Sequence, residues 1–362
     1  MKVIHTADLH LDSKLNANLD REHAANRRGE LLNSFRRLVA IADNEGISAI
    51  LISGDLFDTN RISATAKDVV IGEITSHPNI VFIYLKGNHD SDNFINDENA
   101  PKNLKRFGDE WTTIKLSDKV YVTGEECISY GSYHSLVLDA SRINIVMLHG
   151  QESAAVSKDK ADIINIDALA NKGIDYLALG HIHSYKEARL DGRGVYCYPG
   201  CLEGRGFDEC GEKGFVILDI DEEKSTINRE FVPFAQRRLW LVDTDISDCQ
   251  NAVDITCKIN ERIKEISPKS EDLLKIELIG SIGISDDIDL AYIQKYYESD
   301  YYFVKVKDST GLFVDYNDYA LDMSLKGEFV RLVSADESLS DEDKAQVIKY
   351  GIEALSSGEV GE

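Results

Sequence analysis

The sequence has no run of about 18 uncharged apolar residues, the length that a membrane-spanning helix requires. Its first residues pass directly into polar sequence, without the apolar segment of a secretory signal. These absences predict a cytoplasmic protein that has no membrane partner.

Paired cysteines are also missing. The six cysteines contain no Cys-x-x-Cys motif, so neither a dithiol redox centre nor a zinc site built on paired thiols is predicted. In a cytoplasmic chain of this length we expect free thiols that are buried in the protein interior.

The sequence has few basic residues relative to acidic ones. It contains 40 Lys and Arg and 64 Asp and Glu, which gives a net charge of −24, and the acidic residues are spread along the chain. A broad basic footprint for DNA is therefore excluded. Any nucleic-acid function would depend on bound metal ions, a local basic patch or a partner subunit. The acidity also serves solubility.

The length of 362 residues predicts two or three domains. In the first half, apolar strands such as Lys2–Thr6 and Ala49–Ser53 alternate with helical patterns such as Arg27–Glu45. Short strands then follow closely, one of them at Cys127–Tyr130. This order predicts a layered α/β sandwich.

A new β-α-β-α-β pattern begins near residue 235, with a helix predicted at Cys249–Ile266. We therefore predict three parts. The parts are a domain at 1–234, a small α/β domain at 235–308 and a C-terminal tail at 309–362. The tail is expected to start irregularly and to end in a helix at Asp341–Leu355, with Ser340 as its N-cap.

Five short polar motifs punctuate the first 185 residues, and each follows an apolar run that is predicted to be a strand. They are Asp8-Leu9-His10, Gly54-Asp55-Leu56-Phe57-Asp58, Gly87-Asn88-His89-Asp90, His149-Gly150 and Gly180-His181-Ile182-His183. Because ligands gather at the carboxyl ends of strands in α/β sheets, we expect these side chains to meet at one edge.

The residue types in these motifs predict a metal site. Imidazole and carboxylate suit Mn²⁺, Fe and Zn²⁺, and the spacings Asp-x-His and His-x-His place two side chains on the same side of an extended strand. Asp55 is the natural shared ligand of two ions, which could then clamp a phosphoryl group and activate water. One such motif alone is weak, but the five in this order favour a two-metal phosphoesterase.

The five motifs resemble those of the calcineurin-like metallophosphoesterase superfamily, over residues 1 to about 234. The resemblance implies a four-layer α/β/β/α sandwich followed by a small C-terminal α/β domain. It also implies two ligand sets. One set is Asp8, His10, Asp55 and His183, and the other is Asp55, Asn88, His149 and His181.

The same resemblance implies catalytic roles for two further residues. His89 would approach the phosphate and protonate the leaving group, and Asp58 would orient His89 and raise its pKa. His5 has a different spacing from the Asp8 motif, and we expect it either to be packed in the interior or to contact a metal ligand from behind.

Other segments point to a branch of the superfamily. Phosphoprotein phosphatases carry Arg-Gly and Glu where this chain has Thr59-Asn60 and Asp90. The SbcD-type DNA repair exonucleases are the closer match. Tyr198-Pro199-Gly200-Cys201 and Arg205-Gly206-Phe207-Asp208-Glu209 resemble that branch, and His10-Leu11-Asp12-Ser13 and Leu325-Lys326-Gly327-Glu328-Phe329 resemble its YhaO-like members.

This resemblance implies a DNA exonuclease or endonuclease that cleaves phosphodiester bonds with two divalent ions. Mn²⁺ is the expected ion, with Fe, Zn²⁺ or Mg²⁺ as alternatives. A phosphodiesterase for small molecules or nucleotides, and a metal-bearing scaffold without catalysis, are the other hypotheses. Arg205 would bind the DNA backbone or form an internal ion pair with Asp208 or Glu209.

The resemblance also implies partners. Such nucleases pair with an SMC-like coiled-coil ATPase such as SbcC through a C-terminal segment, for which residues 325–355 are the candidate. Phe329, Leu332 and Val333 are its apolar residues, and they could instead cover the protein's own core. Related nucleases also form homodimers through helices of the first domain, here Arg27–Glu45 or Ala64–Ser76.

Overall fold

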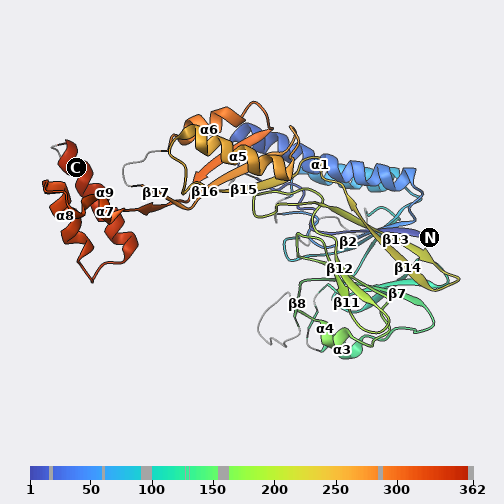
Figure 1. Cartoon of the computed structure of the whole chain (residues 1–362). Coiled ribbons are helices and arrows are strands. Elements are labelled where there is room, and N and C mark those ends of the chain that lie inside the picture. The colour runs from blue at the N-terminus through green and yellow to red at the C-terminus, as the bar shows by residue number, and fades with distance from the viewer. Residues whose placement is uncertain are drawn as a thin grey trace. The chain divides into compact units, whose positions relative to one another are not determined.

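A computed structural model describes most of the chain and divides it into two compact units, Met1–Arg238 and Leu239–Glu362 (Figure 1). The described residues are 1–15, 19–58, 62–90, 100–126, 128–129, 131–153, 163–283 and 288–357. Thr59, Asn60, Cys127 and Tyr130 therefore lie outside the described residues. No helix in these ranges is both long and apolar enough to cross a membrane.

Two six-stranded sheets form the frame of the first unit. The first sheet has the order β14-β13-β1-β2-β3-β4 and the second has the order β11-β12-β10-β7-β6-β5. In the first sheet the strands are β1 (Lys2–Thr6), β2 (Ala49–Ser53), β3 (Val81–Leu85), β4 (Leu104–Arg106), β13 (Gly214–Asp221) and β14 (Thr226–Pro233). In the second they are β5 (Thr112–Lys115), β6 (Val120–Gly124), β7 (Ile143–His149), β10 (Tyr176–Gly180), β11 (Lys186–Arg189) and β12 (Val195–Tyr198).

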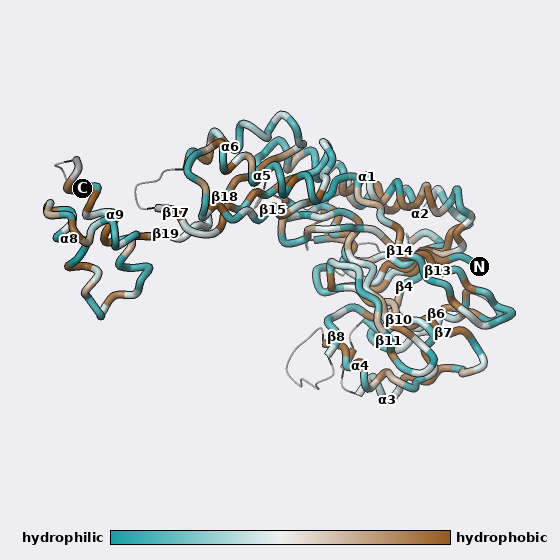
Figure 2. Tube along the Cα trace, viewed as in Figure 1, coloured by the Kyte–Doolittle hydropathy of each residue, from teal (hydrophilic) through white to brown (hydrophobic). Residues whose placement is uncertain are grey.

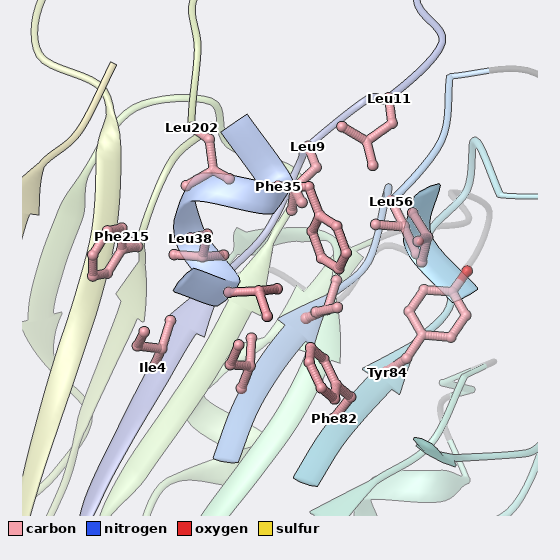
Figure 3. Close-up of a cluster of buried hydrophobic side chains, with 14 of the residues drawn as sticks. Ile4, Leu9, Leu11, Phe35, Leu38, Leu56, Phe82, Tyr84, Leu202 and Phe215 are labelled. Carbon is pink, nitrogen blue, oxygen red and sulfur yellow. The ribbon is translucent and has the colours of Figure 1, made fainter. Parts of the chain in front are cut away.

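Alternating apolar side chains build the layers, because successive residues of a strand face opposite sides of its sheet. On β1, Ile4 packs under helices α1 (Arg21–Asn44) and α2 (Ala64–Ser76), whereas Val3 packs against the second sheet. Figure 3 shows Phe35 of α1 among the strand residues of the helix-facing cluster.

The outer face of the second sheet carries the short helices α3 (Ser132–Ser135) and α4 (Ile166–Leu169). Figure 1 shows these two helices and the pair α1–α2 on opposite sides of the first unit. Both apolar and polar residues occur along α1 and α2, as the brown and teal segments of Figure 2 show. The buried ones, such as Leu31, Phe35 and Leu38 on α1, recur every three or four positions, so each helix has one face for the core. The predicted α/β/β/α sandwich is thus confirmed.

Two elements of the first unit differ from the sequence-based prediction. Helix α1 begins at Arg21, not at residue 27, because Asp20 caps it by accepting the N–H groups of Glu22 and His23. Ile128 and Ser129 do not form the predicted strand; the sheet position beside β7 belongs to β6, which pairs with it in parallel.

The second unit contains a three-stranded parallel sheet, β15 (Leu239–Asp245), β16 (Leu273–Ile279) and β18 (Phe303–Asp308). Helices α5 (Ala252–Ile266) and α6 (Leu290–Tyr297) contribute Ile259 and Ile293 to its core. Helix α5 starts three residues later than predicted because Asn251 caps it. The remaining strands of the chain are β8 (Gln151–Ser153), β9 (Ile163–Asn165), β17 (Ser281–Gly283) and β19 (Gly311–Phe313).

A helical segment with its own small core ends the described part of the chain. It consists of α7 (Tyr316–Ala320), α8 (Leu325–Ser334) and α9 (Asp341–Ser357), around the buried residues Val314, Val330, Ala345 and Ile348. The prediction of an irregular start was wrong, since residues 309–324 contain β19 and α7. The predicted Ser340 cap is confirmed, because its hydroxyl accepts the Asp343 N–H at 3.1 Å.

The free thiols are only partly buried. Cys197 and Cys201 are buried, as predicted, whereas Cys210 and Cys249 are half-buried and Cys257 is exposed. Cys257 lies on α5, whose core face is supplied by other residues, including Ile255 and Ile259. Among the described cysteines, Cys197 lies in the core between the two sheets and Cys249 packs against the core of the second unit.

His5 links the two sheets in the interior. Its Nδ1 lies 2.8 Å from the hydroxyl of Tyr176 on β10, and the residue has no solvent exposure. Burial lowers the pKa of His5 to about 3 from the ordinary 6.5. The imidazole is therefore a neutral packing group, as expected from its spacing.

The buried His5 should make the free energy of unfolding depend on pH. Its pKa is lower in the folded than in the unfolded chain, so the neutral form contributes fully above pH 6.5 and this contribution is lost as the pH falls towards 3. Between pH 6.5 and 5, urea unfolding of metal-free wild type should lose about 2 kcal/mol more than that of His5→Asn. Equal losses in the two proteins would contradict this, and the exposed His134→Asn serves as the control.

Candidate metal centre

The five motifs follow strand ends from both sheets. Strands β1, β2 and β3 are parallel neighbours in the first sheet, and β7 and β10 are parallel neighbours in the second. Strand β2 contacts both β7 and β10, which brings the two sets of carboxyl ends together. The side chains delivered are Asp8 and His10, Asp55 and Asp58, Asn88 and His89, His149, and His181 and His183.

The backbone turns sharply at four of these residues. The φ angles are 53° at Asp8, 45° at His10, 52° at Asp55 and 104° at His181. Positive φ is uncommon outside glycine and persists where the surroundings enforce it, often at functional sites. Here Asp8 and His10 donate their N–H groups to the carbonyls of Gly54 and Asp55, at 3.1 and 2.9 Å. The spacing of the motifs did not predict this feature.

Three motif glycines leave room for neighbouring side chains. A Cβ on Gly180 would lie 1.9 Å from the Ser53 carbonyl, and one on Gly54 would lie 2.1 Å from Nδ1 of His149. A Cβ on Gly87 would lie 2.2 Å from Oδ1 of Asp55. Any side chain at these positions would displace the residues that approach the centre.

His10 and His183 face each other in one half of the centre. Their Nε2 atoms are 3.1 Å apart. Nδ1 of His10 lies 3.0 Å from a carboxylate oxygen of Asp58, and Nδ1 of His183 lies 2.7 Å from one of Glu209. These carboxylates favour protons on both Nδ1 atoms, which leaves two Nε2 lone pairs pointing at each other. A cation between them, with Asp8 nearby, fits this arrangement.

His149 occupies the other half. Its Nδ1 donates to the Ser53 carbonyl at 2.9 Å, so Nε2 of the neutral ring has a lone pair that faces the Asn88 carbonyl oxygen, also at 2.9 Å. Two facing acceptors again fit a cation between them. The His181 ring lies beside that of His149, with 5.4 Å between centroids.

Asp55 lies between the two halves. Its Oδ2 is 3.4 Å from Nε2 of His149 and 3.8 Å from Nε2 of His10, while its Oδ1 accepts the His89 N–H at 2.9 Å. One carboxylate oxygen therefore faces imidazoles of both halves. The donor set of imidazole, carboxylate and amide fits divalent transition-metal ions.

Burial and close contact shift the pKa values of the charged groups in the centre. Burial raises the pKa of Asp8 to about 6, against the opposing attraction of His149 and His183. Burial would also raise the pKa of Asp55, but the imidazoles of His149 and His10 outweigh it and lower that pKa to about 2. The same attraction to Asp55 raises the pKa of His149 to about 9, against its desolvation. Buried carboxylates of this kind are stabilised by bound cations.

His89 is the accessible imidazole of the group, with 47% of its side chain exposed. Its Nδ1 lies 3.8 Å from Asp58, which is closer to His10, at 3.0 Å. Arg205 forms ion pairs with Asp58 at 3.1 Å and with Glu209 at 2.8 Å. Of the two internal partners considered from the sequence, Glu209 is thus the one that the structure places on Arg205.

Sequence reasoning missed the role of Asp90. This buried carboxylate accepts the N–H groups of Gly87, Leu56 and Phe57 at 3.0, 3.2 and 2.8 Å. It therefore ties the loop after β3 to the loop after β2. The signal was present, since Asp90 ends the Gly-Asn-His-Asp motif, but two of its three bonds are to backbone more than 30 residues away.

Comparison with known proteins gives one family match. Residues 1–185 match the family model described as calcineurin-like phosphoesterase. Among curated proteins, the chain is 27% identical to DNA double-strand break repair protein Mre11 of Sulfolobus acidocaldarius over 317 residues, which cover 81% of this chain and 79% of that one.

Two bacterial proteins are similar over comparable lengths. The uncharacterized metallophosphoesterase YhaO of Bacillus subtilis is 27% identical, with 74% of this chain and 68% of that protein covered. One subunit of the nuclease SbcCD from Staphylococcus epidermidis is 23% identical, with 77% and 83% covered. Since the family match extends over more than half of the 362 residues and includes every strand-end motif, the chain belongs to the calcineurin-like phosphoesterases and is a metal-dependent hydrolase of phosphate esters.

Proposed function

We propose that this protein is a Mn²⁺-dependent DNA exonuclease or endonuclease that acts in DNA repair. One observation carries the proposal. In each half of the centre two ligand atoms with lone pairs face each other, and Asp55 lies between the halves. Relatives named as a double-strand break repair protein and as a nuclease subunit support DNA as the substrate.

We assign each half to one ion. The first ion would be held by Asp8, His10, Asp55 and His183, and the second by Asp55, Asn88, His149 and His181. No thiolate belongs to either set, which favours Mn²⁺ over softer ions, with Fe, Zn²⁺ and Mg²⁺ as alternatives. When bound, the two ions supply charge that holds the scissile phosphate and lowers the pKa of water.

Proton transfer to the leaving oxygen is assigned to His89. Its imidazole is exposed to incoming substrate, while its backbone N–H donates to Asp55 and anchors the loop. Asp58 has an oxygen 3.8 Å from Nδ1 of His89 and would orient the ring that donates a proton to the departing oxygen. The buried residues beneath it keep their fixed positions and need no reorganisation during the reaction.

A nuclease assay tests this function. Full-length protein is incubated with Mn²⁺ and either linear DNA, single- or double-stranded, or a small phosphodiester such as bis-p-nitrophenyl phosphate. We expect DNA cleavage that EDTA abolishes. Rapid turnover of the small diester without DNA cleavage, alone and with the ATPase partner present, would favour the small-molecule phosphodiesterase instead.

We further propose that the protein works with an SMC-like coiled-coil ATPase and is cytoplasmic. The chain has a net charge of −24, so a partner would supply part of the positive charge that binds the DNA phosphates. Within this scheme residues 1–234 form the nuclease domain, 235–308 a small capping domain and 309–362 the docking tail. A homodimer through the outer helices of the first unit belongs to the same proposal, and sedimentation would test it.

The docking segment is placed at residues 325–355. Phe329 and Val333 pack against the small core of the tail, whereas Leu332 is 68% exposed and Leu325 66%. Exposed apolar side chains on one helix suit a partner helix. Leu332→Asp should weaken co-purification with the ATPase at least about tenfold, a change of 1.4 kcal/mol. Undiminished binding would contradict this assignment. Val253→Asp, at a 66% exposed position of α5 outside this segment, is the control.

A further inference from the structure

We infer that Glu209 is a positioning residue for His183 and that Arg205 joins it to Asp58, so that one chain of partly buried charges orients an imidazole on each side of the first ion. The inference rests on the metal-binding part of the proposed function. It concerns the segment Cys201–Lys213, which no strand-end motif includes.

Side chains of this segment converge on His183. Glu209 Oε1 lies 2.7 Å from its Nδ1, and Lys213 donates to its carbonyl at 2.7 Å. The Cys201 thiol approaches the same carbonyl at 3.6 Å. Both ends of His183, ring and backbone, are therefore held by one segment.

Glu209 determines which nitrogen of His183 can bind a cation. A carboxylate can only accept, so it keeps the proton on Nδ1 and leaves Nε2 unprotonated. Arg205 Nη2 also lies 3.2 Å from Nδ1, but a guanidinium cannot accept a proton from imidazole. Its N–H groups at Nε and Nη2 go instead to Glu209, at 3.2 and 2.8 Å.

Arg205 extends the chain to the opposite imidazole. Its Nη1 donates to Asp58 at 3.1 Å, and the same Asp58 oxygen lies 3.0 Å from Nδ1 of His10. The contacts therefore run from His183 to Glu209, then to Arg205, then to Asp58 and finally to His10. The side chains of Arg205 and Glu209 are only 18% and 7% exposed.

This placement explains why the buried Glu209 and the half-buried Arg205 and Asp58 lie together beside the centre. Burial of such a chain gains little stability by itself, but it fixes ring orientation where both Nε2 atoms must point at one ion. Oε2 of Glu209 also accepts the backbone N–H of Arg205 at 2.7 Å, and this bond holds the turn from Arg205 to Glu209 together. We therefore place Arg205 behind the ligands and not against the substrate.

The same segment offers a matched control in Glu203. This residue is also a buried carboxylate paired with an arginine, here Arg27 of α1, at 3.4 Å. It also accepts the Gln236 N–H at 2.8 Å. The structure places no bond between Glu203 and the residues of the centre within the described ranges, so Glu203→Gln reports a purely structural loss.

The test measures Mn²⁺ binding to full-length protein by calorimetry. Glu209→Gln keeps the size of the side chain but replaces a carboxylate by an amide, and it should weaken one of the two Mn²⁺ binding steps about 10–100-fold. The other step should stay within about twofold, and Glu203→Gln should leave both unchanged even if it lowers the melting temperature.

The outcomes separate the two claims. Wild type that binds no Mn²⁺ would refute the proposed metal function itself. Wild type that binds two ions, together with Glu209→Gln that binds both with the same affinities, would overturn the positioning role alone. Equal weakening in Glu203→Gln would also overturn it, because the effect would then be general destabilisation.

Discussion

Replacing Asp55 with asparagine should leave a protein that no longer holds two Mn²⁺ ions together and that hydrolyses phosphodiesters on the order of 10³-fold more slowly, equivalent to about 4 kcal/mol. The variant keeps Oδ1, which accepts the His89 N–H. It loses Oδ2, the atom that faces His10 and His149. An amide donor at that position cannot bridge two cations.

Metal analysis and steady-state rates measure this effect. Metal content per chain should fall below two after gel filtration, and kcat should fall with it. The exposed Asp68→Asn on α2 removes one carboxylate from the surface and should change neither quantity. An Asp55→Asn protein that retains two ions and most of its activity would refute the shared-ligand assignment.

Replacing His89 with alanine should lower kcat about 10²–10⁴-fold, the usual contribution of acid–base catalysis. The side chain is 47% exposed and belongs to neither ligand set, so both Mn²⁺ ions should remain. The N–H that anchors the loop to Asp55 is a backbone group and survives the change.

A substrate with a better leaving group provides the sharper comparison. If His89 donates a proton to the departing oxygen, the loss should shrink for a p-nitrophenyl ester, whose leaving oxygen needs no proton. Unchanged activity on DNA, or loss of metal from the variant, would contradict the role. His134→Ala, at an exposed position of α3, should behave like wild type.

The strand-end motifs could be predicted because their signal is local. Each follows an apolar run, and parallel strands place their carboxyl ends at one edge. The structure brings Asp8, Asp55 and His149 into one group with ligand atoms close together. The layered α/β fold followed from the same alternation of strands and helices, whereas its four-layer arrangement was implied by the family resemblance, and the family match agrees with it.

Other features depend on contacts between distant residues, and the sequence alone could not reveal them. Glu209 lies 26 positions beyond His183 in a segment that contains no strand or helix. Strand β6 was missed because it is a short apolar run beside turn residues. Only its pairing with β7 in the folded protein marks it as a strand. Helix α8 was missed because its small core forms only together with α9 and β19.

The left-handed turns at Asp8, His10, Asp55 and His181 have a consequence for any attempt to rebuild or transplant this centre. Aspartate, asparagine and histidine tolerate that backbone far better than branched or bulky residues do. The side chains that a cation requires are therefore also the ones that tolerate positive φ at these positions. Replacement by alanine would remove both the metal ligand and this tolerance, whereas Asp→Asn alters only the coordination chemistry.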